Sequence, residues 1–386
     1  MIDPGKIPLS LYIHVPWCAQ KCPYCDFNSH EGFLDHYQEP YVKALLSDLE
    51  SQLAWVHARP IETLFIGGGT PSLFTGKWID RILSGVASVI SISQAAEITL
   101  ESNPGSAEIE RFKDYRRAGV TRLSIGVQSF DNALLRQLGR IHTGAEARNA
   151  LDWADKSGFD RWNIDLMHGL PGQSPEGASK DIREAIKFSA GHISRYQLTI
   201  ERNTRFWSEP PLLPGESTLE DIERAGETLL FEAGFSQYEV SAFCRPGHEC
   251  RHNVNYWTFG DYLGIGAGAH GKLTLPDGSI VRTQRTRSPM DYLNQSTASP
   301  FAPPITTSIA ADDLPGEFAM NALRLTSGVG TECFTQRTGL AENVLNARAK
   351  TARERGWLTE GESGRFATTP LGFQFLDSVV TTLLSP

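Results

Sequence analysis

The sequence lacks any apolar run that approaches the ~20 residues needed to span a bilayer. Its N-terminus also lacks the basic region, apolar stretch and cleavage site of a secretory signal. Cysteine is scarce, with six in 386 residues, and three of these cluster between positions 18 and 25. Such usage does not form a disulfide framework, so we expect a reducing, cytoplasmic setting and no direct membrane span.

Positive charge is also in short supply, since the formal net charge is −9. This balance argues against a broad nucleic-acid-binding surface, although it leaves room for a local basic groove. Hydrophobic residues make up 40% of the chain and charged residues 21%, which is ordinary for a soluble globular protein. The length is sufficient for two or three domains.

Short apolar β-type runs alternate with amphipathic segments from residue 9 to about 240. Apolar residues recur at helical spacing, for example at Tyr41, Leu45 and Leu49 and again at Trp78 and Ile82. Repeated βα units predict a parallel sheet covered by helices, and six units make a partial (β/α)6 TIM-like barrel over residues 1–240. The strand candidates are LSLYIHV (9–15), ETLFIGGG (62–69), EITLESN (97–103), RLSIGVQS (122–129), RWNIDLMHG (161–169) and RYQLTIE (195–201). The later helix candidates are residues 144–158, 177–189 and 219–234.

The remainder of the chain divides into two further predicted regions. Residues 241–300 are irregular and glycine-dense, and the Pro- and Thr-rich stretch 298–308 is typical of a linker. Residues 301–386 have the order of a small α+β, winged-helix-like domain. Residues 312–386 contain seven Lys and Arg and nine Asp and Glu, so their net charge is negative. We therefore expect a packing or protein-contact module there and no nucleic-acid partner.

The predicted strands end in polar or glycine-rich residues, as in GGGTP (67–71), ESNPG (101–105) and DLMHGLPG (165–172). Any one of these is a common turn. In parallel α/β folds, however, the carboxyl edge of the sheet is where ligands bind. Five successive strands that end this way therefore predict a site at that edge.

Cys18, Cys22 and Cys25 form C-x3-C-x2-C directly after the first predicted strand. A zinc knuckle needs a fourth ligand, which His14 or His30 could supply. A redox C-x-x-C pair leaves Cys18 unexplained. A four-iron cluster with three thiolates has one iron free to chelate S-adenosylmethionine through its amine and carboxylate. Only this third option makes three ligands sufficient.

The next predicted strand ends in the glycine triplet Gly67-Gly68-Gly69. Glycine lets the backbone approach a ligand closely and exposes its N–H and C=O groups. A lone triplet is a weak signal. Next to the cysteine motif, it predicts a site for the methionine amino group.

The sequence resembles radical S-adenosylmethionine (radical SAM) proteins of the oxygen-independent coproporphyrinogen III oxidase group over nearly its full length. The matching stretches are LYIHVPWCAQKCPYCDF, FIGGGTPSL, ESNPG, IGVQSFD, LGRIHT, NIDLMHGLPGQ and HNVNYW. The resemblance implies a [4Fe-4S] cluster ligated by Cys18, Cys22 and Cys25. It implies contacts to S-adenosylmethionine from Tyr12, Tyr24, Gly68 and Glu101. The positions that match a second molecule of this cofactor are Gly69, Thr70, Gln128, Arg140 and Asp165.

Two departures point to the heme-chaperone branch of this family. The oxidase motif ends in a further cysteine where this chain has Phe27, and the oxidase has an N-terminal extension where only 17 residues precede Cys18 here. HNVNYW at 252–257 matches the HNxxYW signature of the chaperone branch. The resemblance therefore implies a cytoplasmic protein that binds heme, delivers it to respiratory heme proteins and dimerises with its cluster. The alternative is a radical SAM oxidoreductase such as the oxidase, acting through a 5′-deoxyadenosyl radical.

Within the signature, His252 is a candidate axial ligand of heme, and Tyr256 and Trp257 could stack on the porphyrin. Two other interpretations stay open: a histidine packed beside core aromatics, or a segment that contacts S-adenosylmethionine or shapes its pocket. Cys244, His248 and Cys250 lie just upstream, either as part of a zinc-like cluster or by chance. We expect Cys333 to be a small buried apolar residue.

Overall fold

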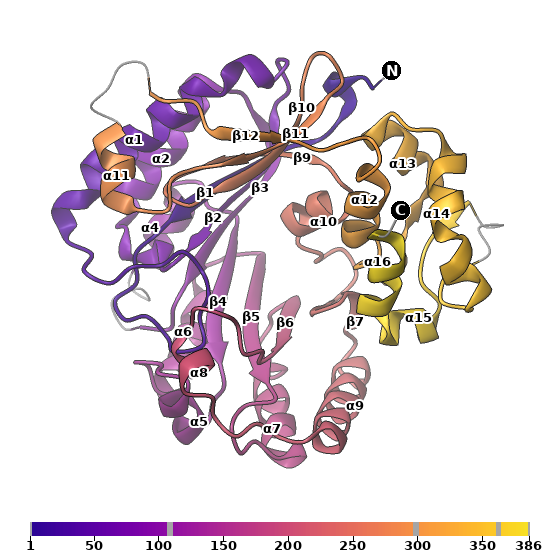
Figure 1. The fold of residues 1–386 in the computed structure, drawn as a ribbon. Helices are drawn as coiled ribbons and strands as arrows, with labels where there is room; N and C mark the ends of the chain where they lie inside the picture. Colours follow the sequence, from indigo (N-terminus) through magenta and orange to yellow (C-terminus); the bar gives the residue numbers. More distant parts are fainter. Residues whose placement is uncertain (1, 106–110, 296–300, 360–363, 385–386) are drawn as a thin grey trace.

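The computed structural model describes residues 2–105, 111–295, 301–359 and 364–384. A 12-stranded sheet runs through the molecule in the order β12-β11-β10-β9-β1-β2-β3-β4-β5-β6-β8-β7 (Figure 1). Its strands are β1 (Leu9–Val15), β2 (Ile61–Gly68), β3 (Ile92–Ser102), β4 (Arg122–Gln128), β5 (Arg161–His168), β6 (His192–Gln197), β7 (Ser236–Glu239), β8 (Ala242–Cys244), β9 (Asp261–Ile265), β10 (His270–Thr274), β11 (Ile280–Gln284) and β12 (Ile305–Ser308).

Helices pack on this sheet and form a separate cluster near the C-terminus (Figure 1). They are α1 (Gln38–Ser51), α2 (Gly76–Val89), α4 (Phe112–Arg117), α5 (Asn132–Gln137), α6 (Gly144–Lys156), α7 (Pro175–Ala185), α8 (Arg205–Ser208), α9 (Glu216–Glu232), α10 (Arg251–Trp257), α11 (Pro289–Gln295), α12 (Leu314–Ala322), α13 (Thr331–Thr338), α14 (Glu342–Glu354), α15 (Pro370–Gln374) and α16 (Leu376–Leu384). Within the described ranges, none is long and apolar enough to cross a bilayer.

Strands β1 to β6 are parallel and lie in chain order, as the six predicted βα units require. The α/β class and the TIM-like parallel core are therefore confirmed. The prediction was wrong about where the sixth strand lies, since β6 begins at His192 and ends at Gln197. Gln197 pairs with His168, the last residue of β5, so residues 198–201 have no neighbouring strand to extend the ladder.

The sheet continues beyond the parallel core on both sides. β9 runs parallel to β1, and β10, β11 and β12 follow it antiparallel. The segment expected to be irregular, residues 241–300, therefore contributes the four strands β8 to β11 and the helices α10 and α11 to the fold. The expected linker contains β12, because Ile305 to Ser308 pair with the otherwise open edge of β11; its residues 298–300 lie outside the described ranges.

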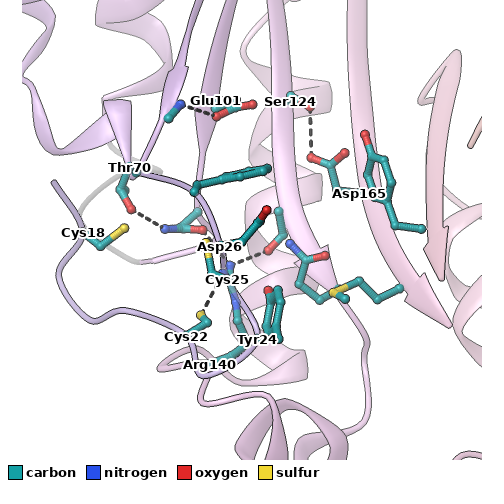
Figure 2. A pocket seen from close by; sticks show the side chains of 18 of the residues that line it. Cys18, Cys22, Tyr24, Cys25, Asp26, Thr70, Glu101, Ser124, Arg140 and Asp165 are labelled. Atoms are coloured by element: carbon teal, nitrogen blue, oxygen red, sulfur yellow. Dashed lines mark hydrogen bonds between the residues drawn. The ribbon is translucent and has the colours of Figure 1, made fainter. Parts of the chain in front are cut away.

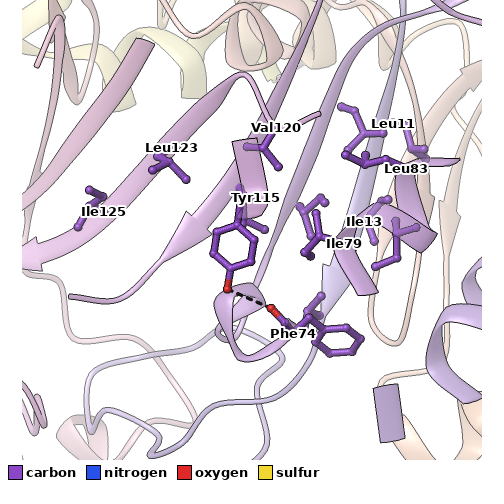
Figure 3. Packing of buried hydrophobic residues seen from close by; sticks show 14 of the residues in the cluster. Leu11, Ile13, Phe74, Ile79, Leu83, Tyr115, Val120, Leu123 and Ile125 are labelled. Atoms are coloured by element: carbon purple, nitrogen blue, oxygen red, sulfur yellow. Dashed lines mark hydrogen bonds between the residues drawn. The ribbon is translucent and has the colours of Figure 1, made fainter. Parts of the chain in front are cut away.

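Side chains along β1 alternate between the two faces of the sheet. Leu9, Leu11, Ile13 and Val15 are fully buried in the core between the sheet and its helices, where Leu11 and Ile13 lie near Ile79 and Leu83 of α2 (Figure 3). Burial of each such side chain contributes about 1.5–3 kcal/mol. The intervening residues of β1 turn to the opposite face of the sheet, whose polar side chains form the site described below.

Local sequence signals set several helix ends. Helix α6 begins with a capping box in which Thr143 Oγ1 accepts from the Glu146 N–H at 3.2 Å and Glu146 Oε2 accepts from the Thr143 N–H at 2.8 Å. Helix α13 ends at Gly339, whose φ of 71° glycine adopts without strain. The start of α6 is therefore marked in the sequence itself by Thr143 and Glu146.

The C-terminal helices enclose a second core around Phe318, Phe334 and Phe366. Strands β13 (Val329–Gly330) and β14 (Arg365–Phe366) pair antiparallel beside these helices. Helices α12, α13 and α14 with this small β-pair, in which β13 precedes α13 and β14 follows α14, give the α+β, winged-helix-like arrangement predicted from the sequence. The boundaries at residues 240 and 300 stay predictions.

Candidate functional site

A pocket of about 350 Å³ opens at the carboxyl ends of the parallel strands (Figure 2). Every parallel strand from β2 to β6 ends at or near it, and the loop after β1 forms one wall. Because parallel strands bring their carboxyl ends to one edge, residues far apart in sequence converge there. Of the predicted site residues, the pocket brings together Cys18, Cys22, Cys25, Tyr24, Gly68, Gly69, Thr70, Glu101, Gln128, Arg140 and Asp165.

The cysteine loop is closed at its base by backbone hydrogen bonds. The Cys18 N–H donates to His30 O at 2.9 Å, and the His30 N–H donates to Pro16 O at 2.7 Å. All three cysteines carry free thiols and line the pocket. Burial raises the pKa of the Cys18 and Cys25 thiols, so their thiolates need a positively charged partner such as iron.

Arg140 brings a fixed positive charge to this loop. Its Nη1 lies 3.8 Å from Cys22 Sγ, and its Nη2 donates to Asn103 Oδ1 at 2.6 Å and to Gly126 O at 2.7 Å. Its Nε–H is buried and has no hydrogen-bond partner among the described residues. A partly buried guanidinium held against a thiol, with an unused donor, fits an anionic cluster and its ligand.

A single zinc ion does not fit this site. In the described parts of the chain, no three His, Cys, Asp or Glu side chains are arranged to hold one metal ion. His14 Nε2 is hydrogen-bonded to Asn28 O at 2.8 Å, and His30 Nε2 is 3.3 Å from Arg287 O. Within the same described ranges, no such group of side chains includes Cys244 or Cys250, which are both buried. Thiols spread around a pocket suit a cluster of several irons better than one ion.

The glycine triplet allows β2 to pass close to the cysteine loop. A Cβ on Gly69 would lie 2.4 Å from Trp17 O, and Gly68 adopts a φ of +119°. A side chain at Gly69 would push the loop away from the sheet, and a Cβ on Gly68 would lie 2.8 Å from Val15 O of the neighbouring strand β1. The Gly68 N–H donates to Glu101 Oε2 at 3.1 Å, so this turn also positions a carboxylate of the pocket.

Glu101 and Asp165 form an acidic wall without a salt bridge in the described part of the chain. Burial, and then the charge of Asp165, raises the pKa of Glu101 to about 8. Burial also raises the pKa of Asp165, whose oxygens accept from Ser124 Oγ at 3.0 Å and Asn163 Nδ2 at 2.8 Å. Two carboxyl groups that face a pocket without a salt-bridge partner favour a positively charged or hydroxyl-rich ligand.

Two predicted site residues lie outside the lining of this pocket. Tyr12 points to the same face of the sheet, but its hydroxyl is hydrogen-bonded to His14 Nδ1 at 2.9 Å and its ring stacks on Phe65. His252, on α10, is 1% exposed. Its Nδ1 lies 2.8 Å from Thr63 Oγ1 and its Nε2 lies 2.7 Å from the Tyr256 hydroxyl.

The surroundings of His252 are those of a packed core residue. Thr63 and Ser10 lie near the amino ends of β2 and β1, so α10 sits at the opposite end of these strands from the cysteine loop. Burial, and secondarily Arg122, lowers the pKa of His252 to about 3, which keeps the ring neutral. Both ring nitrogens are engaged in this conformation, and neither is free to ligate heme iron.

Several pocket residues were not predicted from the sequence, among them Asn103, Met167 and Tyr196. Asn103 donates to Thr70 Oγ1 at 3.0 Å and accepts from Arg140, so it ties the glycine turn to the guanidinium. Met167 and Tyr196 also line the pocket. The strand-end stretches ESNPG and DLMHGLPG were usable signals for Asn103 and Met167, whereas Tyr196 carries no such signal.

Comparisons with known proteins agree with this arrangement. Residues 12–185 match the radical SAM superfamily and residues 309–375 match the HemN C-terminal domain. Heme chaperone HemW of Escherichia coli (strain K12) is 48% identical over 380 residues, covering 98% of each chain, and that of Haemophilus influenzae is 45% identical over 386 residues, covering 99% of each. The structure of coproporphyrinogen III oxidase (HemN) from Escherichia coli superposes with a TM-score of 0.82 at 22% identity, covering 99% of this chain and 91% of that one.

The parallel sheet, the cysteine loop at its carboxyl edge and the superfamily match define a radical SAM protein. Because the identity to HemW chaperones is high and extends over almost the whole of both chains, this chain belongs to the HemW family.

Proposed function

We propose that the protein is a cytoplasmic heme chaperone that holds a [4Fe-4S] cluster and S-adenosylmethionine in the cysteine pocket, binds heme and delivers it to respiratory heme proteins. The observation that carries the cofactor assignment is the convergence of three free cysteines, the glycine turn and Arg140 on one pocket. The names of the HemW relatives support the chaperone role.

Cys18, Cys22 and Cys25 would hold the cluster, whose fourth iron supplies a coordination site for the amine and carboxylate of S-adenosylmethionine. The other pocket residues have separable roles toward this ligand. Glu101 and Asp165 complement a sulfonium or ribose hydroxyls because neither has a salt-bridge partner among the described residues. Tyr24, Gly68, Gly69, Thr70 and Gln128 complete the walls.

Phe27 favours transport of heme over conversion of a porphyrin. It lines the pocket where the oxidase motif has a further cysteine, and 59% of its surface is exposed. We therefore assign no catalytic residue. The protein differs at this position from an enzyme that would need a thiol beside its cofactor.

The test is an anaerobic reconstitution followed by two assays on one sample. We expect hemin to bind stoichiometrically in a Soret titration and coproporphyrinogen III to persist under reducing conditions with S-adenosylmethionine. Formation of protoporphyrinogen would contradict the chaperone assignment in favour of an oxidoreductase. Transfer of the bound heme to an apo respiratory heme protein, measured by recovery of its activity, tests the delivery step.

Dimerisation is a further part of this proposal. Sedimentation of the protein with and without its cluster should show a dimer only in the cluster-loaded sample. A monomer in both samples would remove dimerisation from the proposal and leave the cofactor assignment intact.

A further inference from the structure

Strand β4 ends in a strained turn on the wall of the cysteine pocket. Leu123 and Ile125 of this strand face the core (Figure 3), whereas Gln128 at its end lines the pocket. Gln128 has a φ of 69°, and the Ser129 N–H donates to Val127 O at 2.9 Å across it. A hydrogen bond that spans one residue of positive φ defines a rare and strained form of γ-turn. Among the described non-glycine residues with a positive φ, Gln128 alone lines this pocket.

The strain at this turn brings an unused polar group to the pocket. The side-chain amide of Gln128 has no hydrogen-bond partner among the described residues. Glycine would adopt the same φ without strain, but it would offer no side chain. A strained residue with free bonding capacity at a pocket indicates that its side chain is used there. An amide both donates and accepts hydrogen bonds, as the hydroxyls and ring nitrogens of a nucleoside do.

Hydrogen bonds to the backbone fix the residues that precede Gln128. Arg140 Nη2 donates to Gly126 O at 2.7 Å, and His142 Nε2 donates to Val127 O at 3.1 Å. The pairing of β4 with β5 also shifts register between Gly126 and Gln128. Strained conformations persist only where the surrounding contacts hold them.

Asp181, on α7, holds the two residues that follow Gln128. Its Oδ2 accepts from Ser129 Oγ at 2.8 Å, and its Oδ1 accepts from the Phe130 N–H at 2.8 Å. Asp181 is 4% exposed and does not line the pocket itself. The neighbouring Arg148 pairs with Glu184 at 2.6 Å. Burial raises the pKa of Asp181 to about 6, so at neutral pH it is mostly ionised and makes two charge-assisted hydrogen bonds.

We propose that Asp181 is a positioning residue for the S-adenosylmethionine site, because it holds Ser129 and Phe130 so that the Gln128 amide stays directed into the pocket. This inference rests on the proposed binding of S-adenosylmethionine to that pocket. Contact from Gln128 is already part of the proposed function. The inference adds that a carboxylate on α7, outside the pocket, sets the strength of that contact.

A double-mutant cycle tests whether Asp181 acts through Gln128. The affinity of the full-length, cluster-loaded protein for S-adenosylmethionine is measured by anaerobic calorimetry. Gln128→Ala should weaken binding about tenfold, since one or two hydrogen bonds are lost. Asp181→Asn keeps the shape but puts an amino group against one of the two donors, and it should weaken binding about fivefold. In the Gln128→Ala background, Asp181→Asn should have no further effect.

A second pair of variants tests the strain. Gln128→Gly and Gln128→Ala both remove the amide, so they should lose the same affinity for S-adenosylmethionine. Only glycine relieves the positive φ, so Gln128→Gly should unfold at a higher urea concentration than Gln128→Ala. Equal urea midpoints would contradict the strained turn.

The matched control is Asp155→Asn, which alters a helix carboxylate that also accepts from a serine hydroxyl, Ser189 Oγ, but lies outside the pocket lining. Its affinity should equal that of the wild type. Ser129→Ala, which removes one bond to Asp181, should weaken binding about threefold and serves if Asp181→Asn does not fold. The inference would be overturned by an unchanged affinity in Asp181→Asn, or by equal losses in the two backgrounds of the cycle. Absence of binding to the wild type would overturn the proposed cofactor and this inference together.

Discussion

The cysteine pocket and helix α10 contain the two strongest motifs of the sequence, and the charged side chains of the pocket differ from His252 of α10 in their bonding state. In the pocket, Arg140 retains an unused donor and Glu101 and Asp165 have no salt-bridge partner in the described residues. On α10, both nitrogens of His252 are hydrogen-bonded, and Asn255 donates to Ser10 Oγ and Asp261 O. Unmet bonding capacity marks a ligand site, whereas satisfied capacity marks a structural contact.

The largest effect should come from the pocket thiols. Cys22→Ser should reduce the iron content of the reconstituted protein from about four atoms per chain to almost none. The control is Cys333→Ser, since this partly buried cysteine lies in the C-terminal core and contacts Thr258 O. Iron and sulfide analysis measures the cluster content of both variants. Retention of a full cluster by Cys22→Ser would place the cluster elsewhere.

The next effect concerns stability. His252→Ala should lower the free energy of unfolding by about 3 kcal/mol, because it creates a buried cavity and leaves Thr63 and Tyr256 without their partner. The folded fraction of this variant should bind hemin with the affinity of the wild type. Urea unfolding and Soret titration give the two numbers. A loss of hemin binding with normal stability would make His252 a heme ligand and erase the contrast between the two regions.

The low pKa of His252, about 3, adds a pH signature to that comparison. A histidine whose folded pKa lies below its unfolded value of about 6.5 stabilises the fold above pH 6.5, and this contribution is lost as pH falls from 6.5 toward 3. The unfolding free energy of His252→Gln should therefore fall less steeply over this range than that of the wild type. Equal slopes would indicate that the imidazole can charge within the fold.

A smaller effect should appear at the acidic wall. Glu101 has a pKa of about 8, so it is largely protonated at pH 7, and a cationic ligand should lower that pKa and release a proton. Binding of S-adenosylmethionine should thus strengthen as pH rises toward 8. Calorimetry in buffers of different ionisation enthalpy counts the proton. Glu101→Gln should release none, and equal release from this variant would assign the proton to another group.

The smallest effect should come from Phe27→Cys. Because the ring is 59% exposed, its replacement should change the free energy of unfolding by no more than about 0.5 kcal/mol. The variant should bind a cluster as the wild type does. A large loss of stability would mean that Phe27 packs against a surface, and would weaken its interpretation as an open wall of the pocket.

The sequence was sufficient for the parallel core and for most of the pocket. The cysteine spacing and the glycine triplet are local signals, and each follows a strand whose alternation is plain, so their meeting at one edge follows from topology. The capping residues of α6 are equally local. These features needed no knowledge of contacts between distant residues.

The rest depends on contacts that no local pattern encodes. Thr63 meets His252 across 189 positions, so a motif suited to heme ligation could not reveal that both nitrogens are occupied. Residues 305–308 form a strand only because β11 offers an open edge. The side chain of Tyr12 lies on the same face of the sheet as the pocket residues, but its hydroxyl is hydrogen-bonded to His14. In each case, packing decided what residue type alone left open.

The most direct test of the cysteine pocket is the electron paramagnetic resonance spectrum of the reduced, reconstituted protein before and after addition of S-adenosylmethionine. A cluster held by Cys18, Cys22 and Cys25 has one iron open to the ligand, so the g-values should shift on addition, and the shift should be absent with an analogue that lacks the amino group. An unchanged spectrum with saturating S-adenosylmethionine would contradict the assignment of this pocket.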